Sequence, residues 1–231
     1  MAASSVIAGV LGLLSYRLFH SPPLARAVFS PKPPVQPKDC SGLGTGLASF
    51  STAQKPVESA KPLREDEVAI YTAVIREWLS GSPASLNISA RNSTLKANSL
   101  STALIDCACS AGIQLESLLS ASHSYHRLTP GILPVEHLRL VDPNGQATIV
   151  HDNDPNTAMR HGKSSTGAVE SAVANGLFTL SEIAFDAQRK HALVSYSFVC
   201  GSLCGSGNTW VFEKAAGEWK KVNLGCGGWV S

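Results

Sequence analysis

The C-terminal third of the chain constrains the fold most, because apolar, β-branched stretches alternate there with short polar segments. The predicted strands are 178–185, 191–200, 208–214 and 219–224, and the connections are the polar segment 186–190, the glycine-rich loop 201–207 and the turn 215–218. Strands joined by so little chain can pair only antiparallel. The pattern therefore predicts a meander of three or four strands with one face free to pack against a helix.

A strong helix pattern precedes this region. Apolar side chains recur at three- and four-residue steps over 65–79 and so share one face of a helix. They are Val68, Tyr71, Val74, Ile75, Trp78 and Leu79. Glu65, Asp66 and Glu67 fall in the first turn, where carboxylates stabilise the positive end of the helix dipole. The two patterns together predict an α+β fold, with this N-terminal helix packed on a mainly antiparallel sheet that ends in the three- to four-stranded meander.

The middle of the chain has weaker patterns. They predict a strand at 85–90, a helix at 102–122 with a weak point at Gly112, a strand at 135–141, a turn at 142–145, a second strand at 147–151, a loop at 152–166 and a short helix at 168–175 capped by Gly176. Trp78, Trp210 and Trp219 are expected in the core, and Trp229 has no predicted place.

The N-terminal 27 residues have features of a signal peptide. The apolar run 5–14 is too short to span a bilayer, which takes about 20 residues, and Ala25-Arg26-Ala27 is a small-x-small cleavage site. The alternatives are an uncleaved tether, which would associate the protein with a membrane through this apolar segment, and an organelle transit sequence. The proline- and glycine-rich composition of residues 28–62 predicts a linker, which leaves 63–231 as a single α+β domain.

The charge distribution argues against nucleic acid as a partner. Residues 1–38 hold four basic residues and no acid, and the whole chain holds 19 basic and 17 acidic residues, so the remainder carries 15 basic against 17 acidic. A nucleic-acid-binding domain concentrates positive charge on its folded surface. Here that part of the chain is slightly acidic.

Six cysteines predict disulfides and an oxidising compartment, since the count is even and the leader is of the export type. The disulfide candidates are Cys107, Cys109, Cys200, Cys204 and Cys226, while Cys40 lies in the linker, where its role stays open. Six cysteines allow 15 full pairings. The connectivity is therefore open, with Cys200–Cys204 the favoured pair and Cys226 the competing partner. A bond between Cys107 and Cys109 would be strained, so each is expected to pair elsewhere.

No complete catalytic, cofactor or metal motif is present. Cys200 and Cys204 are separated by three residues in a hairpin, whereas redox pairs favour two residues at a helix start, so a structural disulfide is favoured over a redox or metal-binding pair. The segment 152–163 has the first acids of a calcium loop but lacks its glycine and its final acid, so a solvated turn is expected. No cofactor is expected.

The C-terminal motif resembles that of a family of uncharacterised bacterial proteins, often with export leaders. The shared features are a strand, a C-G-x-L-C-G-x-G loop at 200–207, a strand ending in Glu213-Lys214 and a Gly217-x-Trp219 turn. The resemblance is strong over 178–220 and weaker over 63–226. The chain differs from the family at 152–170, where the family usually has an aromatic-containing segment and this chain is polar. The resemblance implies the fold and an exported origin, and it implies no activity.

These observations predict an exported domain, periplasmic or extracellular, with a non-enzymatic role in binding or in the cell envelope. The alternative is an enzyme, thiol-based or hydrolytic, whose site is assembled only in the fold. A pocket that gathers Cys, His and acidic side chains would favour the enzyme. Cysteines paired in disulfides and a shallow sheet face would favour binding.

The leader is expected to be removed after Ala27, because the apolar run cannot span a membrane and a cleavage site follows it. Intact-mass measurement of the exported protein should then give a chain that begins at Val28. A mature chain that still begins at Met1 or Ala2 would indicate a tether instead.

Overall fold

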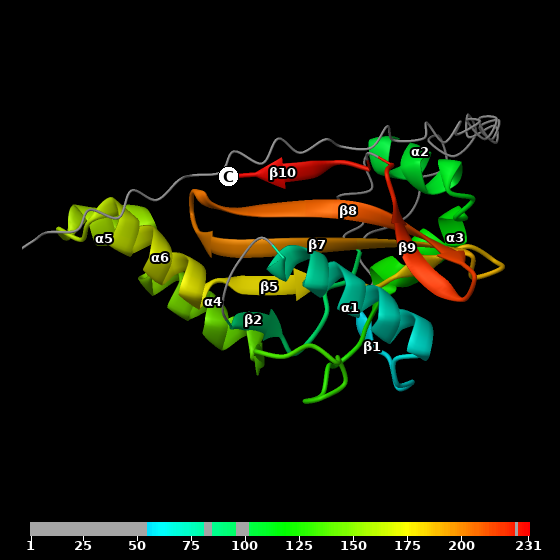
Figure 1. The fold of residues 1–231 in the computed structure, drawn as a ribbon, viewed down its shortest axis with the longest axis horizontal. Helices are drawn as coiled ribbons and strands as arrows, with labels where there is room; N and C mark the ends of the chain where they lie inside the picture. Colours follow the sequence, from blue (N-terminus) through cyan, green and yellow to red (C-terminus); the bar gives the residue numbers. More distant parts are fainter. Residues whose placement is uncertain (1–54, 81–84, 96–101, 225) are drawn as a thin grey trace, which may run out of the picture. The chain divides into compact units, whose positions relative to one another are not determined.

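A mainly antiparallel sheet forms the centre of the structure (Figure 1). The computed structural model describes residues 55–80, 85–95, 102–224 and 226–231, all within one compact unit. The strand order is β10-β8-β7-β5-β2-β4, with β6 paired to β7 and β9 paired to β8. The strands are β2 (Leu86–Ser89), β4 (Leu138–Val141), β5 (Leu177–Leu180), β6 (Ala184–Phe185), β7 (His191–Gly201), β8 (Cys204–Ala215), β9 (Glu218–Val222) and β10 (Gly228–Val230).

The long hairpin of β7 and β8 organises this sheet, and β9 continues it as the predicted meander. Strand β2 pairs in parallel with β4 and with β5, whereas the pairs β5–β7, β6–β7, β7–β8, β8–β9 and β8–β10 are antiparallel. A separate parallel pair joins β1 (Val57–Glu58) to β3 (Ser124–Tyr125). The α+β class and the mainly antiparallel sheet are therefore confirmed.

Helix α1 (Glu65–Leu79) packs on one face of the sheet, with the bounds that the sequence predicts (Figure 1). Its buried side chains belong to the same core as Phe178 of β5 and Phe212 of β8. The Arg64 backbone N–H donates to the Glu67 carboxylate at 2.6 Å, so the acidic first turn also caps the helix. Each large side chain buried here stabilises the fold by about 1.5–3 kcal/mol.

Two shorter helices cover part of the opposite face. Helices α2 (Thr102–Ser110) and α3 (Leu115–His123) pack Leu104, Ala108 and Leu118 against Leu193 of β7 and Val211 of β8. A single helix was predicted over 102–122. The chain instead turns at Gly112, which has a φ of 74°, a value that glycine adopts without steric cost. The groove described below lies along the remaining length of this sheet face.

The predicted turn at 142–145 and strand at 147–151 are wrong, because these residues form helix α4 (Pro143–Asp152). Asp142 is its N-cap, accepting a hydrogen bond from Gly145 N at 2.8 Å, and Pro143 occupies the first helical turn. The dipeptide Asp-Pro suits both a β-turn and a helix start. The apolar residues that followed it were too few to decide between the two.

The predicted loop at 152–166 is wrong as well. Residues within it form helix α5 (Pro155–Arg160) and the start of helix α6 (Ser165–Asn175). Asp154, expected in a solvated turn, is 7% exposed and caps α5 by accepting from Thr157 N at 3.1 Å. Its pKa lies well below the ordinary value because the backbone and hydroxyl of Ser202 also donate to it. Helices α4, α5 and α6 lie together near the tip of the β7–β8 hairpin (Figure 1).

Several strand bounds also differ from the predictions. The expected strand 178–185 is divided into β5 and β6, and the expected strand 135–141 is paired only as β4. The expected glycine-rich loop 201–207 is short, since β8 already begins at Cys204. Glycines 205 and 207 therefore lie within a strand, where they leave space above the sheet.

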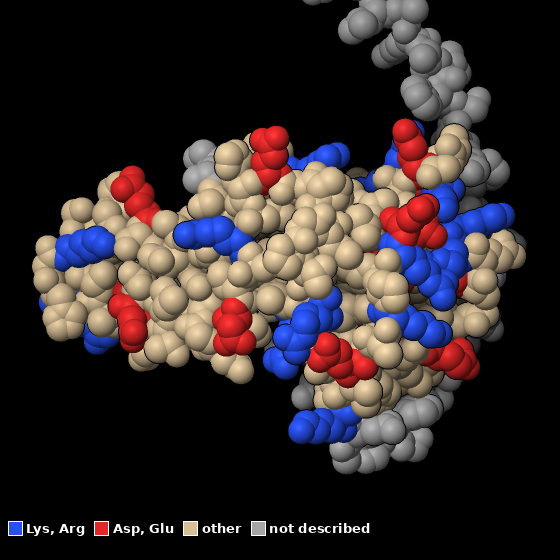
Figure 2. All heavy atoms as spheres, turned by 90° about the horizontal axis from the view of Figure 1, so that it is seen from below, with Lys and Arg blue, Asp and Glu red and all other residues tan. Residues whose placement is uncertain are grey.

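Trp219 is only partly buried, which corrects the prediction of a core position. Its indole N–H donates to Asp66 at 2.9 Å, and Lys214 contacts the same carboxylate at 2.7 Å. Burial opposes the charge of Asp66, but these hydrogen bonds outweigh it and hold its pKa below the ordinary value. Trp78 and Trp210 likewise pack against the core while remaining partly exposed. On the face shown in Figure 2, basic and acidic side chains are interspersed.

A buried polar network joins α1 to the loops at one end of the sheet. The carboxylate of Glu182 accepts from Asn92 Nδ2 at 2.6 Å and contacts His126 Nδ1 at 2.7 Å. Asn92 Nδ2 also donates to the Tyr71 hydroxyl at 2.8 Å, and that hydroxyl donates to the Ser181 carbonyl at 2.8 Å. Burial raises the pKa of Tyr71 well above its ordinary value, and the charge of Glu182 adds to this effect. The phenol therefore stays protonated and available as a donor.

Replacing Tyr71 by Phe should lower the free energy of unfolding by about 1–3 kcal/mol, because the Ser181 carbonyl loses its buried donor. Urea denaturation followed by circular dichroism measures this loss. Tyr125→Phe is the matched control, since its hydroxyl contacts Glu58 at 3.2 Å in an exposed position. Equal losses for the two variants would show that the buried network contributes nothing special to stability.

Candidate functional site

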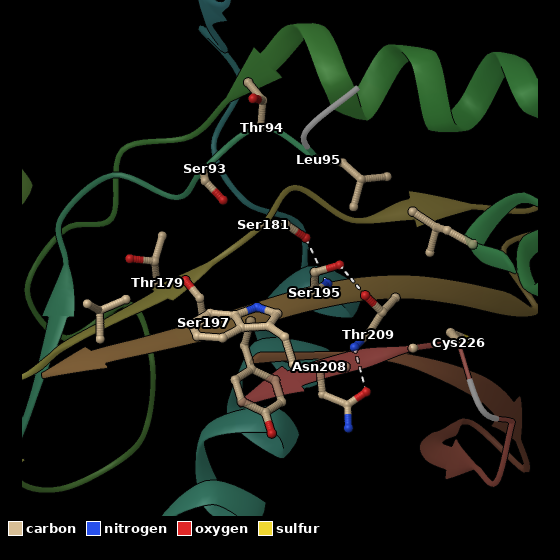
Figure 3. Close-up of a pocket in the computed structure, with 16 residues that line it drawn as sticks. Ser93, Thr94, Leu95, Thr179, Ser181, Ser195, Ser197, Asn208, Thr209 and Cys226 are labelled. Atoms are coloured by element: carbon tan, nitrogen blue, oxygen red, sulfur yellow. Dashed lines mark hydrogen bonds between the residues drawn. The ribbon is translucent and has the colours of Figure 1, made fainter. Parts of the chain in front are cut away.

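A groove with a volume of about 470 Å³ lies on the face of the sheet that α2 and α3 leave uncovered (Figure 3). Its lining contains serine, threonine, asparagine, glycine and apolar side chains and, in the described part of the chain, no charged residue. The lining residues are Ser93, Thr94, Leu95, Leu104, Thr179, Ser181, Ser195, Tyr196, Ser197, Val199, Asn208, Thr209, Cys226, Gly227, Gly228 and Trp229. We call this site the hydroxyl groove.

Strand register arranges the floor of the hydroxyl groove. Thr179 of β5 lies opposite Ser197 of β7, which lies opposite Gly207 of β8, and Gly207 lies opposite Trp229 of β10. Residues that pair across neighbouring strands share one face of the sheet. One row of the floor therefore runs from a threonine hydroxyl, across a serine hydroxyl and a glycine, to an indole ring.

A second row of hydroxyls lies beside the first and is bonded within the protein. The Ser195 hydroxyl lies 2.7 Å from the Thr209 hydroxyl, and the Ser195 backbone N–H donates to the Ser181 hydroxyl at 2.8 Å (Figure 3). By contrast, the hydroxyls of Thr179 and Ser197 have no hydrogen-bond partner within the described residues. The first row is thus free to bind a ligand, while the second row fixes the floor.

Glycines 205 and 207 leave the space above the sheet that the Trp229 indole occupies, and we call this pair the glycine seat. A Cβ atom at position 207 would lie 2.7 Å from Cε2 of the indole, and one at position 205 would lie 3.2 Å from Cη2. Side chains at either position would therefore displace the ring. This close approach gives a physical reason for the last two glycines of the C-G-x-L-C-G-x-G motif, which sequence reasoning had assigned to a loop.

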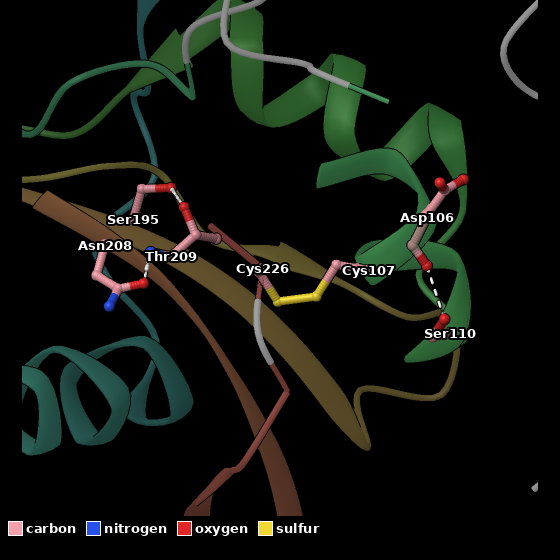
Figure 4. Close-up of a disulfide and its surroundings, with 7 residues drawn as sticks. All are labelled: Asp106, Cys107, Ser110, Ser195, Asn208, Thr209 and Cys226. Carbon is pink, nitrogen blue, oxygen red and sulfur yellow. Dashed lines mark hydrogen bonds between the residues drawn. A yellow bond between two sulfur atoms is a disulfide. The ribbon is translucent and has the colours of Figure 1, made fainter. Parts of the chain in front are cut away.

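The Cys107–Cys226 disulfide holds the segment that carries Trp229 (Figure 4). It joins α2 to the start of this segment, with a Cα–Cα distance of 5.3 Å. Thr209 N donates to the Gly227 carbonyl at 3.1 Å, and Ser231 N donates to the Gly205 carbonyl at 3.0 Å. A covalent bond and a strand pairing therefore fix the indole at the border of the groove.

The Cys200–Cys204 disulfide closes the tip of the β7–β8 hairpin, as predicted, with a Cα–Cα distance of 5.0 Å. A Cβ atom at Gly201 would lie 2.6 Å from Cδ of Pro155, so this glycine allows the tip to approach α5. Cys226 bonds to Cys107 and is not the partner of this pair. Cys109 is also disulfide-bonded, and Cys40 lies outside the described residues.

The disulfides remove the described thiols from thiolate or metal chemistry. In the described part of the chain no free cysteine is present, and no group of three or more His, Cys, Asp and Glu side chains is placed to hold a metal ion. The thiol-based alternative therefore has no candidate nucleophile among these residues. The paired cysteines indicate an oxidising environment.

A second cleft, of about 320 Å³, opens at the partly buried His126 and its buried partner Glu182. Serines and charged side chains surround it: Ser59, Lys61, Arg64, Glu67, Ser117, Ser120, Ser124, Asp186 and Arg189 belong to its lining. Glu182 contacts Nδ1 of the imidazole, while Nε2 has no hydrogen-bond partner within the described residues. An imidazole oriented by a carboxylate in this way has the geometry of a general base. Sequence reasoning found no partner for this histidine, because 56 residues separate it from Glu182.

The hydroxyl groove was also absent from the sequence predictions. The pattern Ser195-Tyr196-Ser197 within an otherwise apolar strand was the available signal, since alternation places both serines on one face. From the sequence alone, the serine-bearing face of this strand is predicted to be exposed to solvent, because the neighbouring strands are not known. Trp229, which had no predicted place, lines the groove.

Comparison of the chain with protein-family models, with curated proteins and with solved structures gave no match. Among the helices that the structure describes, none is long and apolar enough to cross a membrane.

Replacing Gly207 by Ala should displace Trp229 and lower the free energy of unfolding by about 1–3 kcal/mol, because the added methyl overpacks the indole seat. The indole N–H resonance of Trp229 should shift in the same variant. Gly145→Ala is the matched control, because its Cβ would make an ordinary 3.5 Å contact with Asp142. An unshifted indole resonance in Gly207→Ala would contradict the glycine-seat interpretation.

Proposed function

We propose that this chain is an exported, non-enzymatic ligand-binding domain and that the hydroxyl groove is its ligand site. The observation that carries the proposal is the pair of unpartnered hydroxyls, Thr179 and Ser197, on the floor of a groove with an uncharged lining. Their neighbours in the second row are bonded to one another. Concave sites with a few convergent polar groups on an apolar, preformed surface are typical of ligand-binding proteins.

The uncharged lining defines the kind of ligand. A phosphate or carboxylate in the groove would be removed from water without a cationic partner among the described residues, and such desolvation is costly. A ligand that donates and accepts hydrogen bonds without a net charge meets no such cost. We therefore propose a neutral, hydrogen-bonding ligand.

The proposed compartment is the periplasm or the extracellular space. Disulfides persist in these oxidising compartments, and the N-terminal sequence has features of an export signal. Membrane tethering through the N-terminal apolar segment is the alternative, and residues 1–54 lie outside the described part of the chain. The likeness to a bacterial family with export leaders is a further argument for this location and gives no activity.

A second candidate function is hydrolysis in the His126 cleft. The observation that favours it is the imidazole held by Glu182 beside Ser117, Ser120 and Ser124. In such a reaction Nε2 would accept a proton from a serine hydroxyl or a water molecule as that oxygen attacks a carbonyl carbon. We rank it second, because Glu182 and its partners Asn92 and Tyr71 also serve as a buried structural network.

Nuclear magnetic resonance titration with small probes tests the proposed function. Neutral probes (a trisaccharide and a capped hexapeptide amide) are compared with anionic counterparts of similar size. We expect a neutral probe to shift the amide signals of Thr179 and Ser197, and the double variant Thr179→Val, Ser197→Ala to weaken that binding. Ser120→Ala, in the other cleft, is the control and should bind normally.

Two outcomes would contradict the proposed function. The first is that none of the probes shifts the groove signals. The second is that the shifts centre on His126 and that an activated ester is hydrolysed by the native chain but not by His126→Asn. The second result would establish the hydrolytic alternative.

A further inference from the structure

We propose that the ligand of the hydroxyl groove is a neutral carbohydrate, one sugar ring of which stacks on the indole of Trp229. This inference rests on the proposed function and names the ligand class of the same site. It depends on three features of the groove: the position of the indole, the row of hydroxyls that leads away from it, and the hydrogen-bonded state of the sheet beneath.

Trp229 has the position of a stacking platform. The indole covers Gly205 and Gly207 on one side and is 45% exposed, although it lines a concave site. A tryptophan ring offers a flat, apolar surface with a negative π face, which suits the C–H groups on one face of a sugar ring. Pairing of β10 with β8 and the Cys107–Cys226 bond hold the ring in place before the ligand arrives. Little side-chain freedom is then lost on binding.

The hydroxyl row provides the polar half of the site. The indole lies over Gly207 of β8, so from the ring the row crosses two strand steps to Thr179. Neighbouring strands lie about 4.8 Å apart, which gives a span of roughly 10 Å. This span suits a disaccharide, or two rings of a trisaccharide, that lies across the strands. Each free hydroxyl both donates and accepts a hydrogen bond, as the hydroxyls of a sugar do.

The paired sheet favours a sugar over a peptide. The backbone groups of β7 and β8 in the floor are hydrogen-bonded to a strand on either side, and the sheet edge on this side belongs to β10, at the border of the groove. Peptides that bind to sheets depend on an unpaired edge for main-chain hydrogen bonds. The floor offers side-chain hydroxyls and an aromatic face instead, which is the chemistry of carbohydrate recognition.

Titration of the full-length protein with cellotriose and with triacetylchitotriose tests the inference. Binding is followed through the Trp229 indole N–H signal and the amides of Ser197 and Thr179. Trp229→Ala should weaken binding at least tenfold, and Trp229→Phe should weaken it less, since a smaller ring keeps a stacking face. Thr179→Val should weaken it roughly 3- to 10-fold, the equivalent of one hydrogen bond.

The control is Trp219→Phe, which changes a partly exposed tryptophan beside Asp66 and should leave sugar binding unchanged. A neutral hexapeptide amide that shifts the groove signals while neither sugar does would overturn the carbohydrate inference and leave the proposed function standing. Tighter binding of trigalacturonic acid than of either neutral sugar would also overturn it. If none of these probes shifts the groove signals, both the inference and the proposed function fail.

Discussion

Glu182 places a carboxylate where little water reaches it, and much of the surrounding structure satisfies that group. An uncompensated buried charge would be severely destabilising, so the carboxylate requires donors on fixed positions. Asn92 and His126 supply them, and Asn92 in turn contacts Tyr71 of α1. The network thereby ties α1 and two loops to the end of β5. It also fixes Ser181, whose carbonyl accepts from Tyr71 and whose hydroxyl accepts from the backbone of β7.

The position of Ser181 links this network to the hydroxyl groove. Its side chain lines the groove, whereas its carbonyl points toward the α1 side of the sheet. The buried network around Glu182, on the α1 side of the sheet, therefore supports the ordered second row of hydroxyls on the groove side. A floor whose second row is already bonded leaves the first row, Thr179 and Ser197, as the groups available to a ligand.

The sequence predicted correctly those elements whose start, end and apolar face are all marked by their own residues. Helix α1 has an acidic first turn and an uninterrupted apolar face, and β7 and β9 are bounded by polar turns, so their predicted bounds agree closely with the structure. The prediction for the residues of helix α4 was wrong because Asp142-Pro143 serves equally as a turn and as a capped helix start. The choice between the two depends on tertiary contacts, such as the hydrogen bond from Gln146 to the Asn175 carbonyl.

The candidate site was harder to predict than the fold, because its parts come from distant positions in the sequence. The favoured Cys200–Cys204 pair could be predicted from its spacing, but the partner of Cys107 lies 119 residues away. The glycines at 205 and 207 signalled a loop, since nothing in their neighbourhood indicates that a tryptophan from β10 covers them. Only strand register reveals that Thr179, Ser197 and Trp229 share one row.

A crystal structure of the full-length protein grown with a neutral trisaccharide tests the central claim most directly. We expect ordered sugar in the hydroxyl groove, with one ring parallel to the Trp229 indole and hydroxyl contacts to Ser197 and Thr179. Ligand density in the His126 cleft, with an empty groove in the same crystal, would contradict the claim.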